Sequence, residues 1–249
     1  MANLYHTKLL PTSITVTSAQ TGYGADNLFL ESIARNWRAT ATTQQDIEFN
    51  YAVGQTVQAL LAHDLNFDSA EVWVKVGAGA YANVGTLNAY KNKEGRRRGL
   101  YVIGGTANVT GIRLRILNGA AADGLAYKRV GSLLVFSGAI ALPPGPTWGY
   151  NANWRIPRVS SQIVNGQRPR ADVGVAHHLI NCSIEPYTTE DWQPAIAALQ
   201  AGTCALSMGL GAPRQWQIWP VTLENDEIND VSAGPANSRF DLVLREAIA

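Results

Sequence analysis

The sequence has few charged side chains and almost no cysteine. Charged residues make up 16% of the 249 residues, whereas about 25% is usual for soluble domains. The formal net charge is +1, so no overall electrostatic attraction to nucleic acid is expected. Cys182 and Cys204 are too few for a disulfide framework and are not spaced as zinc ligands. We expect both to be buried free thiols.

Long apolar runs are also missing. No stretch is apolar for ~18 residues, so the sequence predicts no membrane-spanning helix. The first residues show no basic segment followed by an apolar run, so no secretory signal is predicted and folding in a reducing cytoplasm is expected. Yet 46% of the residues are hydrophobic. That is enough for a sizeable core, in a chain long enough for one large domain or two moderate ones.

The common catalytic motifs are absent. The sequence holds no Gly-x-Ser-x-Gly, no phosphate-binding loop and no His-Glu-x-x-His. His63, Asp64 and Asp68 could suggest a metal or acid–base site, but neighbouring strand residues point to opposite faces, which favours a polar turn at a strand end. The same argument makes His177 and His178 structural or interface residues. We therefore predict no catalytic residue, no metal site, no cofactor and no enzyme activity. The alternative is an enzyme such as a glycan hydrolase, but no motif in the sequence indicates one.

Alternation of apolar and polar residues predicts strands throughout the first 138 residues. The run at 57–62 is continuously apolar, which is typical of a strand buried on both faces. Turn residues separate the predicted strands, and seven or eight short strands at such spacing indicate an antiparallel sandwich. The remaining alternating segments lie at residues 12–17, 46–51, 70–76, 100–103, 109–117 and 127–137.

A proline-rich run at residues 142–146 interrupts this pattern. Proline cannot continue a central strand or a helix, so we place a domain boundary there, with domains at 1–140 and 141–249. The second domain has further strand patterns and one predicted helix at about 188–201, with Thr188 as its cap. The sequence thus predicts a mainly β protein, an antiparallel β-sandwich followed by a β-rich α+β domain with one helix.

One basic cluster stands out, formed by Lys91, Lys93, Arg96, Arg97 and Arg98. We interpret it as a solvated loop between strands. The alternative is a contact to an acidic neighbouring subunit or to a phosphate.

Aromatic residues form a second candidate surface. Trp148, Tyr150 and Trp154 follow the proline run, and together with Trp37 and Trp73 they could form a platform for stacking sugars. We favour packing between the domains as the explanation of this aromatic group.

Short phrases in the first domain carry a family resemblance. They are Asn27-Leu28, Trp37-Arg38 with Thr40, Ala62-His63-Asp64-Leu65 and Ile112-Arg113-Leu114-Arg115-Ile116. These phrases resemble the discoidin-like (coagulation-factor type C) sandwich, a galactose-binding-like jelly roll, in the version found in tail proteins of tailed bacteriophages. Asp64 stands where the family usually has Asn, and Ala39 is an extra residue in the Trp-Arg-Ser/Thr phrase.

The resemblance implies roles for several of these residues. It marks a fold signature in which Trp37-Arg38 holds a loop over the core and His63-Asp64 closes a buried strand. The signature residues are Asn27, Leu28, Trp37, Arg38, His63 and Asp64.

The second domain is similar to the β-rich, one-helix part of distal-tail or baseplate-type proteins. The resemblance implies a structural component of a phage tail tip or baseplate, in the form of an oligomeric ring that joins the tail tube to host-recognition parts. Its partners would be the tail tube, hub, tape measure and fibre proteins. The protein would fold and assemble in the host cytoplasm and reside in the virion tail, without nucleic-acid binding or membrane insertion.

The alternative function is a carbohydrate-binding module that recognises a host-surface glycan. Discoidin-like folds bind glycans, lipids or protein neighbours through loops at one end of the sandwich, so the resemblance allows this function too. The expected contacts for a glycan or a neighbouring subunit are Trp73, Arg96, Arg97, Arg98, Trp148, Tyr150 and Trp154.

Overall fold

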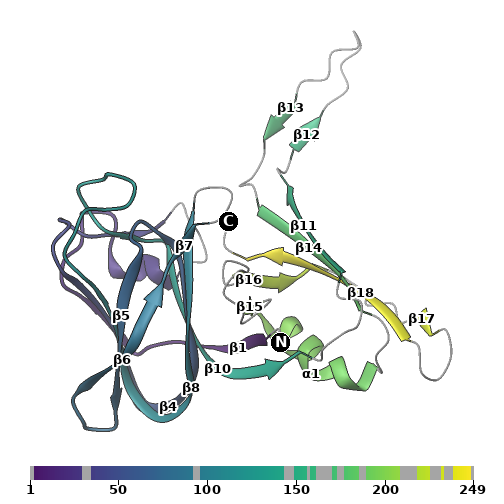
Figure 1. Ribbon diagram of the computed structural model, residues 1–249, viewed down its shortest axis with the longest axis horizontal. Helices are drawn as coiled ribbons and strands as arrows, with labels where there is room; N and C mark the ends of the chain where they lie inside the picture. Colours follow the sequence, from purple (N-terminus) through teal and green to yellow (C-terminus); the bar gives the residue numbers. More distant parts are fainter. Residues whose placement is uncertain are drawn as a thin grey trace.

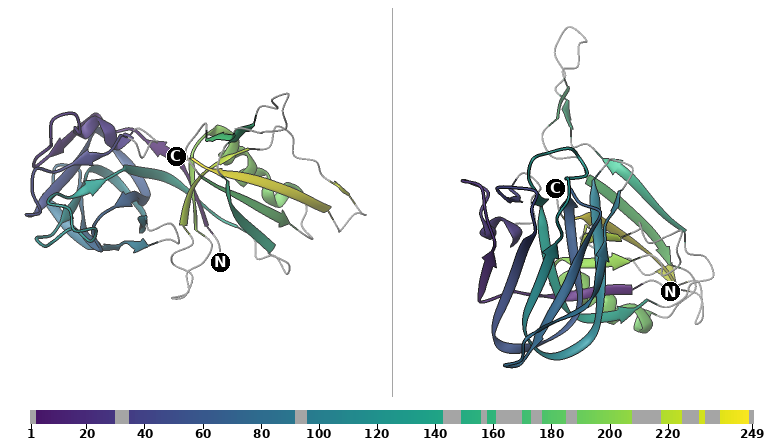
Figure 2. Two further views of the ribbon diagram at one scale, coloured as in Figure 1. Left: turned by 90° about the horizontal axis from the view of Figure 1, so that it is seen from above. Right: turned by 60° about the vertical axis from the view of Figure 1, so that its left-hand side comes forward.

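The computed structural model shows two units side by side, an N-terminal sandwich and a C-terminal unit with one helix (Figures 1 and 2). It describes residues 3–29, 35–91, 96–142, 149–155, 158–160, 170–172, 177–184, 189–207, 218–224, 231–232 and 238–247.

The N-terminal unit contains the short 3-10 helix η1 (Ala25–Phe29) and strands β1 to β10. The strands are β1 (Asn3–Leu9), β2 (Ser13–Val16), β3 (Trp37–Arg38), β4 (Gln45–Leu65), β5 (Ser69–Val76), β6 (Tyr81–Asn88), β7 (Tyr90–Lys91), β8 (Arg97–Ile116), β9 (Arg129–Val130) and β10 (Ser132–Ala141). The C-terminal unit contains β11 (Gly149–Arg155), β12 (Arg158–Ser160), β13 (Arg170–Asp172), β14 (His177–Ile184), α1 (Thr189–Ala201), β15 (Cys204–Ser207), β16 (Ile218–Leu223), β17 (Val231–Ser232) and β18 (Ser238–Glu246).

Two long strands, β4 and β8, belong to both sheets of the sandwich. The first half of β4 pairs with β2 and with the second half of β8, which also pairs with β5. The second half of β4 pairs with β10 and with the first half of β8. The register of β4 with β8 shifts repeatedly between Asn50 and Ala59, and such bulges let a strand bend from one sheet into another. We call the half with β2, β5 and β6 sheet I and the half with β1 and β10 sheet II.

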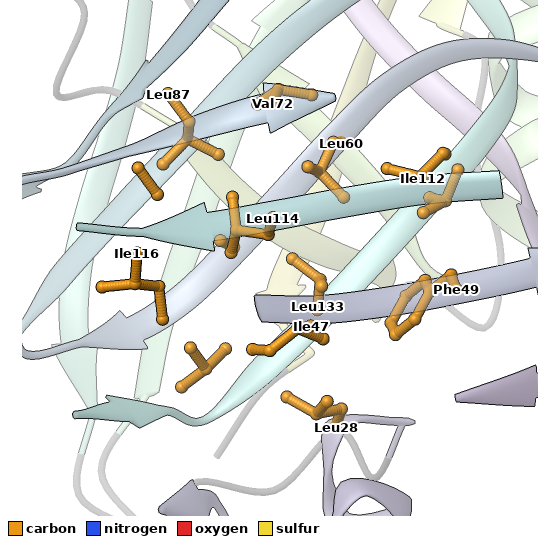
Figure 3. Packing of buried hydrophobic residues seen from close by; sticks show 14 of the residues in the cluster. Leu28, Ile47, Phe49, Leu60, Val72, Leu87, Ile112, Leu114, Ile116 and Leu133 are labelled. Carbon is orange, nitrogen blue, oxygen red and sulfur yellow. The ribbon is translucent and has the colours of Figure 1, made fainter. Parts of the chain in front are cut away.

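The core of the sandwich lies between these two sheets. Every second residue of the strands points into it, as the period of a β-strand requires. Ile47 and Phe49 come from β4, and Ile112 and Leu114 come from β8. Figure 3 shows these side chains converging with those of neighbouring strands and with Leu28 from η1.

Sheet II continues into the C-terminal unit. β1 pairs with β10 on one side and with β15 on the other, so one hydrogen-bonded path runs through both units. In the C-terminal unit the path follows the order β11, β14, β18, β16 and β15. One face of these strands packs against α1 through Trp192, Ile196 and Leu199. A separate small core, which includes Leu61, Phe136 and Ile218, joins the outer face of sheet II to β15 and β16.

The predicted fold class is confirmed, since the structure is mainly β with a sandwich followed by strands and one helix. The predicted helix at 188–201 corresponds to α1. The predicted short strands at 46–51 and 57–62 are wrong in one respect, because they are halves of the single strand β4. Strand β1 was missed because it lacks a period of two: Leu4 packs into the C-terminal core, whereas its neighbour Tyr5 packs into the core between the units.

The boundary predicted at 140 falls at the end of β10. Because the sheet path passes through that region, the division into domains 1–140 and 141–249 stays a prediction. The prolines of the boundary lie outside the described residues.

Candidate functional site

The outer face of sheet I carries a dense set of polar and aromatic side chains. Residues that point away from the core alternate with core residues along each strand. The register places Asp46, Arg115 and Glu71 in one row across three strands, and Glu48, Arg113 and Trp73 in the next. We call this set the polar–aromatic face; its members are Asp46, Glu48, Asn50, Glu71, Trp73, Tyr81, Arg113 and Arg115.

The charged groups of this face are fixed by one another. Arg115 binds Asp46 through two bonds, with Nε and Nη2 each 2.9 Å from a carboxylate oxygen. The Nε of Arg113 donates to Oε1 of Glu48 at 2.7 Å. The bidentate bond to Asp46 raises the pKa of Arg115. Each of these four side chains keeps about a fifth of its surface exposed, so the pairs remain accessible from solvent.

Two aromatic rings lie beside these pairs. The guanidinium carbon of Arg115 is 4.9 Å from the centroid of a Trp73 ring, and that of Arg113 is 4.1 Å from the centroid of Tyr81. Such cation–π contacts hold both partners in place. The Nε1 of Trp73 donates to Oε2 of Glu71 at 2.9 Å, which fixes the orientation of the indole.

Tyr81 lies across neighbouring strands. Its hydroxyl donates to Oδ1 of Asn50 on β4, at 3.3 Å. The ring passes over Gly111, where a Cβ atom would lie only 2.5 Å from the hydroxyl oxygen. Burial, and secondarily the Glu48 carboxylate, raise the pKa of Tyr81. Gly111 is therefore required for Tyr81 to reach Asn50.

Four of the signature residues, Asn27, Leu28, Trp37 and Arg38, lie at one end of the sandwich, whereas His63 faces the C-terminal unit. Asn27 donates through Nδ2 to the carbonyl oxygens of Gly22 and Asn36, which closes the loop before β3. Trp37 is fully buried and donates through Nε1 to the carbonyl oxygen of Ser18, at 3.0 Å. Because its ring is fully buried, Trp37 is not available to stack on a sugar; its role in holding the loop over the core stays a prediction.

Arg38, the neighbour of Trp37 in β3, is half-buried. Its guanidinium carbon lies 3.7 Å from the centroid of the Tyr23 ring and 5.3 Å from that of Tyr127. Its Nε donates to Oδ1 of the buried Asn36, at 2.8 Å. We call this arrangement of Tyr23, Asn36, Arg38 and Tyr127 the arginine slot.

A buried ionic group lies where the C-terminal unit meets sheet II. Nη2 of Arg98 is 3.1 Å from Oε1 of Glu246, and its Nη1 donates to the carbonyl oxygen of Ile218 at 2.7 Å. Nε2 of His63 lies 3.5 Å from the same Glu246 oxygen. Burial lowers the pKa of His63, which favours the neutral ring, and the charge of Arg98 acts in the same direction. We call this set the junction group.

The interpretation of the basic cluster as a solvated loop is therefore wrong for Arg97 and Arg98. Both residues belong to β8. Arg97 pairs with Asp68 at 2.9 Å, while Arg98 is 1% exposed and faces the C-terminal unit. The acidic partner of Arg98 comes from the same chain, so Arg98 is not a glycan contact. Arg96 precedes β8 and is half-buried.

The remaining predicted residues divide into those that the structure places and those that it does not. Asp64 lies within the buried last part of β4 in a left-handed conformation (φ 52°), and its Oδ1 lies 3.3 Å from Nη2 of Arg129. Trp148 lies outside the described residues, and Tyr150 and Trp154 belong to β11 with side chains that are not described. The side chains of His177, His178 and Cys182 are likewise outside the description, whereas Cys204 is a buried free thiol as predicted.

Sequence reasoning missed the main features of all three groups. The alternation at residues 109–117 does put Arg113 and Arg115 on the face opposite the core residues of β8. Sequence reasoning found no role for Tyr23, Tyr81, Tyr127 or Glu246. Among the described residues, no group of three or more histidine, cysteine or acidic side chains is arranged to hold a metal ion. No helix within the described part has the length and hydropathy needed to cross a bilayer.

Comparison with known proteins gives structural similarities only. No protein-family model and no curated protein matches the sequence. One similar solved structure is the CBM32 module of AlyQ in complex with 4,5-unsaturated mannuronic acid, at 18% identity and a TM-score of 0.39, over 53% of this chain and 100% of that one. Another is the family 32 carbohydrate-binding module of NanJ from C. perfringens in complex with galactose, at 12% identity and a TM-score of 0.41, over 50% and 92%. The lectin domain of lectinolysin complexed with Lewis B antigen shares 8% identity, with a TM-score of 0.40, over 51% and 92%.

Proposed function

We propose that this protein is a carbohydrate-binding protein without catalytic activity, and that its polar–aromatic face is the binding surface. The observation that carries the proposal is the pair of rings, Trp73 and Tyr81, set beside two arginine–carboxylate pairs whose geometry is already fixed. Recognition sites commonly combine such apolar surfaces with a few precisely placed polar groups.

The chemistry of this face suits a sugar. A pyranose ring has apolar C–H faces that pack on aromatic rings and a rim of hydroxyls that need both donors and acceptors. Asp46 and Glu48 supply acceptors, while Arg113 and Arg115 supply donors. Because these groups already hold one another, binding immobilises few additional side chains, which lowers its entropic cost. The two arginine–carboxylate pairs are neutral, and Glu71 adds a negative charge beside Trp73, so the face suits a neutral ligand better than an acidic one.

The test is a screen of neutral oligosaccharides followed by calorimetry with the best ligand. We expect Trp73→Ala to weaken binding at least tenfold, because it removes the stacking surface. Trp73→Phe keeps a ring and should retain part of the affinity. Leu117→Ala, at an exposed residue just beyond the end of β8, is the control and should bind like the wild type. Failure to bind any glycan, or an unaltered affinity in Trp73→Ala, would refute the proposal.

A second candidate function is a structural role in a phage tail tip or baseplate, as the family resemblance implies. The observation that supports it is that the two units are joined by a continuous sheet, a shared apolar core and the junction group. A structural component that transmits mechanical force between neighbouring subunits needs its own two units to be firmly joined. The proposed partners are further copies in a ring, the tail tube, hub, tape measure and fibres, with the virion tail as location.

Two measurements on the purified protein test this role: light scattering gives the size of the oligomer, and electron microscopy gives its symmetry. A closed ring, such as a hexamer or trimer, would support it, because head-to-tail interfaces close into cyclic symmetry. A stable monomer that is also absent from virions would count against it. Glycan binding and ring assembly are compatible, since the polar–aromatic face lies on sheet I and the units are joined through sheet II.

A further inference from the structure

We propose that the arginine slot is a second binding position, and that it takes the carboxylate group of an acidic sugar such as a uronate. The slot lies at the loop end of the sandwich and shares no residue with the polar–aromatic face. The inference rests on the proposed glycan-binding function and specifies a ligand class for it.

The first observation is that the Arg38 guanidinium is held in place before any ligand arrives. The rings of Tyr23 and Tyr127 flank it, and Asn36 accepts its Nε–H. The backbone fixes the same residues, because Arg38 donates its backbone N–H to the carbonyl oxygen of Tyr23 at 3.3 Å. A positioned guanidinium loses less conformational entropy on binding than a free one.

The second observation is that most of its donors remain unused. A guanidinium has five N–H donors, and the single bond from Nε to Asn36 uses one. Among the described residues, Nη1 and Nη2 of Arg38 make no hydrogen bond and no ion pair with a carboxylate. Arg97, Arg113 and Arg115 differ in this respect, because each is bound to an acidic side chain.

The third observation concerns local charge. Arg38 lies directly opposite Arg129 in the β3–β9 pair, and like charges at opposed positions repel. Arg129 is compensated by Asp64 at 3.3 Å and by Asp123 at 3.7 Å. Within the described part of the chain, Nζ of the nearby Lys128 donates to the carbonyl oxygens of Gly119 and Ala120. Arg38 is therefore the cation of this group that an added anion would compensate best.

A carboxylate suits the slot better than other anions. The Nη1 and Nη2 edge of a guanidinium matches the two oxygens of a carboxylate in one plane, with two parallel hydrogen bonds. Flanking tyrosine rings restrict approach to that plane and offer edges on which the attached sugar ring packs. A tetrahedral phosphate can meet the same donors with two oxygens, but its other two oxygens then lie above and below the plane, on the sides where the tyrosine rings pack.

The experiment titrates the full-length, ¹⁵N-labelled protein with tetragalacturonate, with a neutral galactose tetramer and with inorganic phosphate. We expect tetragalacturonate to shift the Nε–Hε resonance of Arg38 and to bind at least tenfold more tightly than either other probe. Arg38→Lys keeps the charge but loses the planar pair of donors, and should weaken tetragalacturonate binding at least tenfold. Arg35→Gln removes a positive charge from an exposed neighbouring residue. This control should change the affinity for tetragalacturonate less than threefold.

The outcomes separate the two proposals. If the neutral tetramer binds and tetragalacturonate binds no better, the inference fails while the proposed function stands. If tetragalacturonate binds through Arg38 but no neutral glycan binds at Trp73, the slot stands and the proposed surface fails. If Arg38→Lys and Arg35→Gln weaken tetragalacturonate binding equally, the binding is due to general electrostatic attraction, and the inference is overturned. Phosphate binding as tight as that of tetragalacturonate would overturn the assignment to a carboxylate.

Discussion

Removing the negative charge of the junction group should destabilise the whole protein. Glu246 and Arg98 are each about 2% exposed and lie 3.1 Å apart. Glu246→Gln keeps the volume of the side chain but removes the negative charge that lies 3.1 Å from the buried Arg98 guanidinium. Breaking a buried ion pair from one side typically costs roughly 3–5 kcal/mol. Since a domain is typically stable by only about 5–15 kcal/mol, this is a large fraction of the total.

The assay is equilibrium unfolding in urea, followed by both tryptophan fluorescence and far-UV circular dichroism. The matched control is Glu224→Gln, because Glu224 pairs with Arg245 on β18 at the surface, with exposed fractions of 36% and 50%. An exposed pair of this kind contributes only about 0–1 kcal/mol. The double variant Arg98→Met/Glu246→Gln removes both charges and should be more stable than Glu246→Gln alone.

Two results would refute this reasoning. One is a loss in Glu246→Gln no larger than that in Glu224→Gln, which would mean that the junction is hydrated or open in solution. The other is a double variant whose loss of stability equals the sum of the losses measured for Arg98→Met alone and Glu246→Gln alone, because coupled residues should deviate from additivity.

Three further predictions follow from the described residues. Burial lowers the pKa of His63, so the unfolded chain takes up a proton below pH ~6.5 that the folded protein does not. Stability is therefore present above that pH and declines below it, by up to about 1.4 kcal/mol per pH unit, and His63→Gln should flatten this decline in urea titrations from pH 7.5 to 5.5. Burial raises the pKa of the Cys204 thiol to about 12, so mass spectrometry should find it unmodified by iodoacetamide at pH 8 until urea unfolds the chain; rapid labelling of native protein would contradict its burial. Gly111→Ala should displace the Tyr81 hydroxyl from Asn50, with a cost of roughly 0.5–1.5 kcal/mol for the lost hydrogen bond and weaker neutral-glycan binding; a crystal structure with Tyr81 unmoved would contradict this.

Local sequence patterns were sufficient to predict which residues of the strands point into the core. Ile47 and Phe49, like Ile112 and Leu114, alternate with charged residues and point into the sandwich as the period predicts. The same alternation placed Arg113 outward. The pattern could not show that β4 continues through residues 51–56, because the bulges there break the period of two while the pairing with β8 persists.

The candidate sites were less accessible to sequence reasoning because each depends on distant segments. Arg98 appears in the sequence as part of a basic run, and only the fold brings Glu246, the last residue of β18, to it. The arginine slot depends on the turn that carries Tyr23, which Asn27 closes through backbone carbonyls. Tyr81 reaches Asn50 only because Gly111 on β8 has no side chain. None of these contacts between distant residues produces a periodic pattern in the sequence from which it could be predicted.

The position of β1 constrains the order in which the protein can fold. Residues 3–9 are made early, yet they pair with residues of β10 on one side and with Cys204–Ser207 of β15 on the other. Neither edge of β1 can form its backbone pairing until β10 and β15 have left the ribosome, which happens much later. Closing such long loops slows folding. During synthesis β1 presents unpaired backbone groups and the side chains of Leu4 and Tyr5, which is a typical starting point for aggregation. We expect a chaperone that shields the nascent N-terminal segment to raise the yield of folded protein more than one that acts on the completed chain.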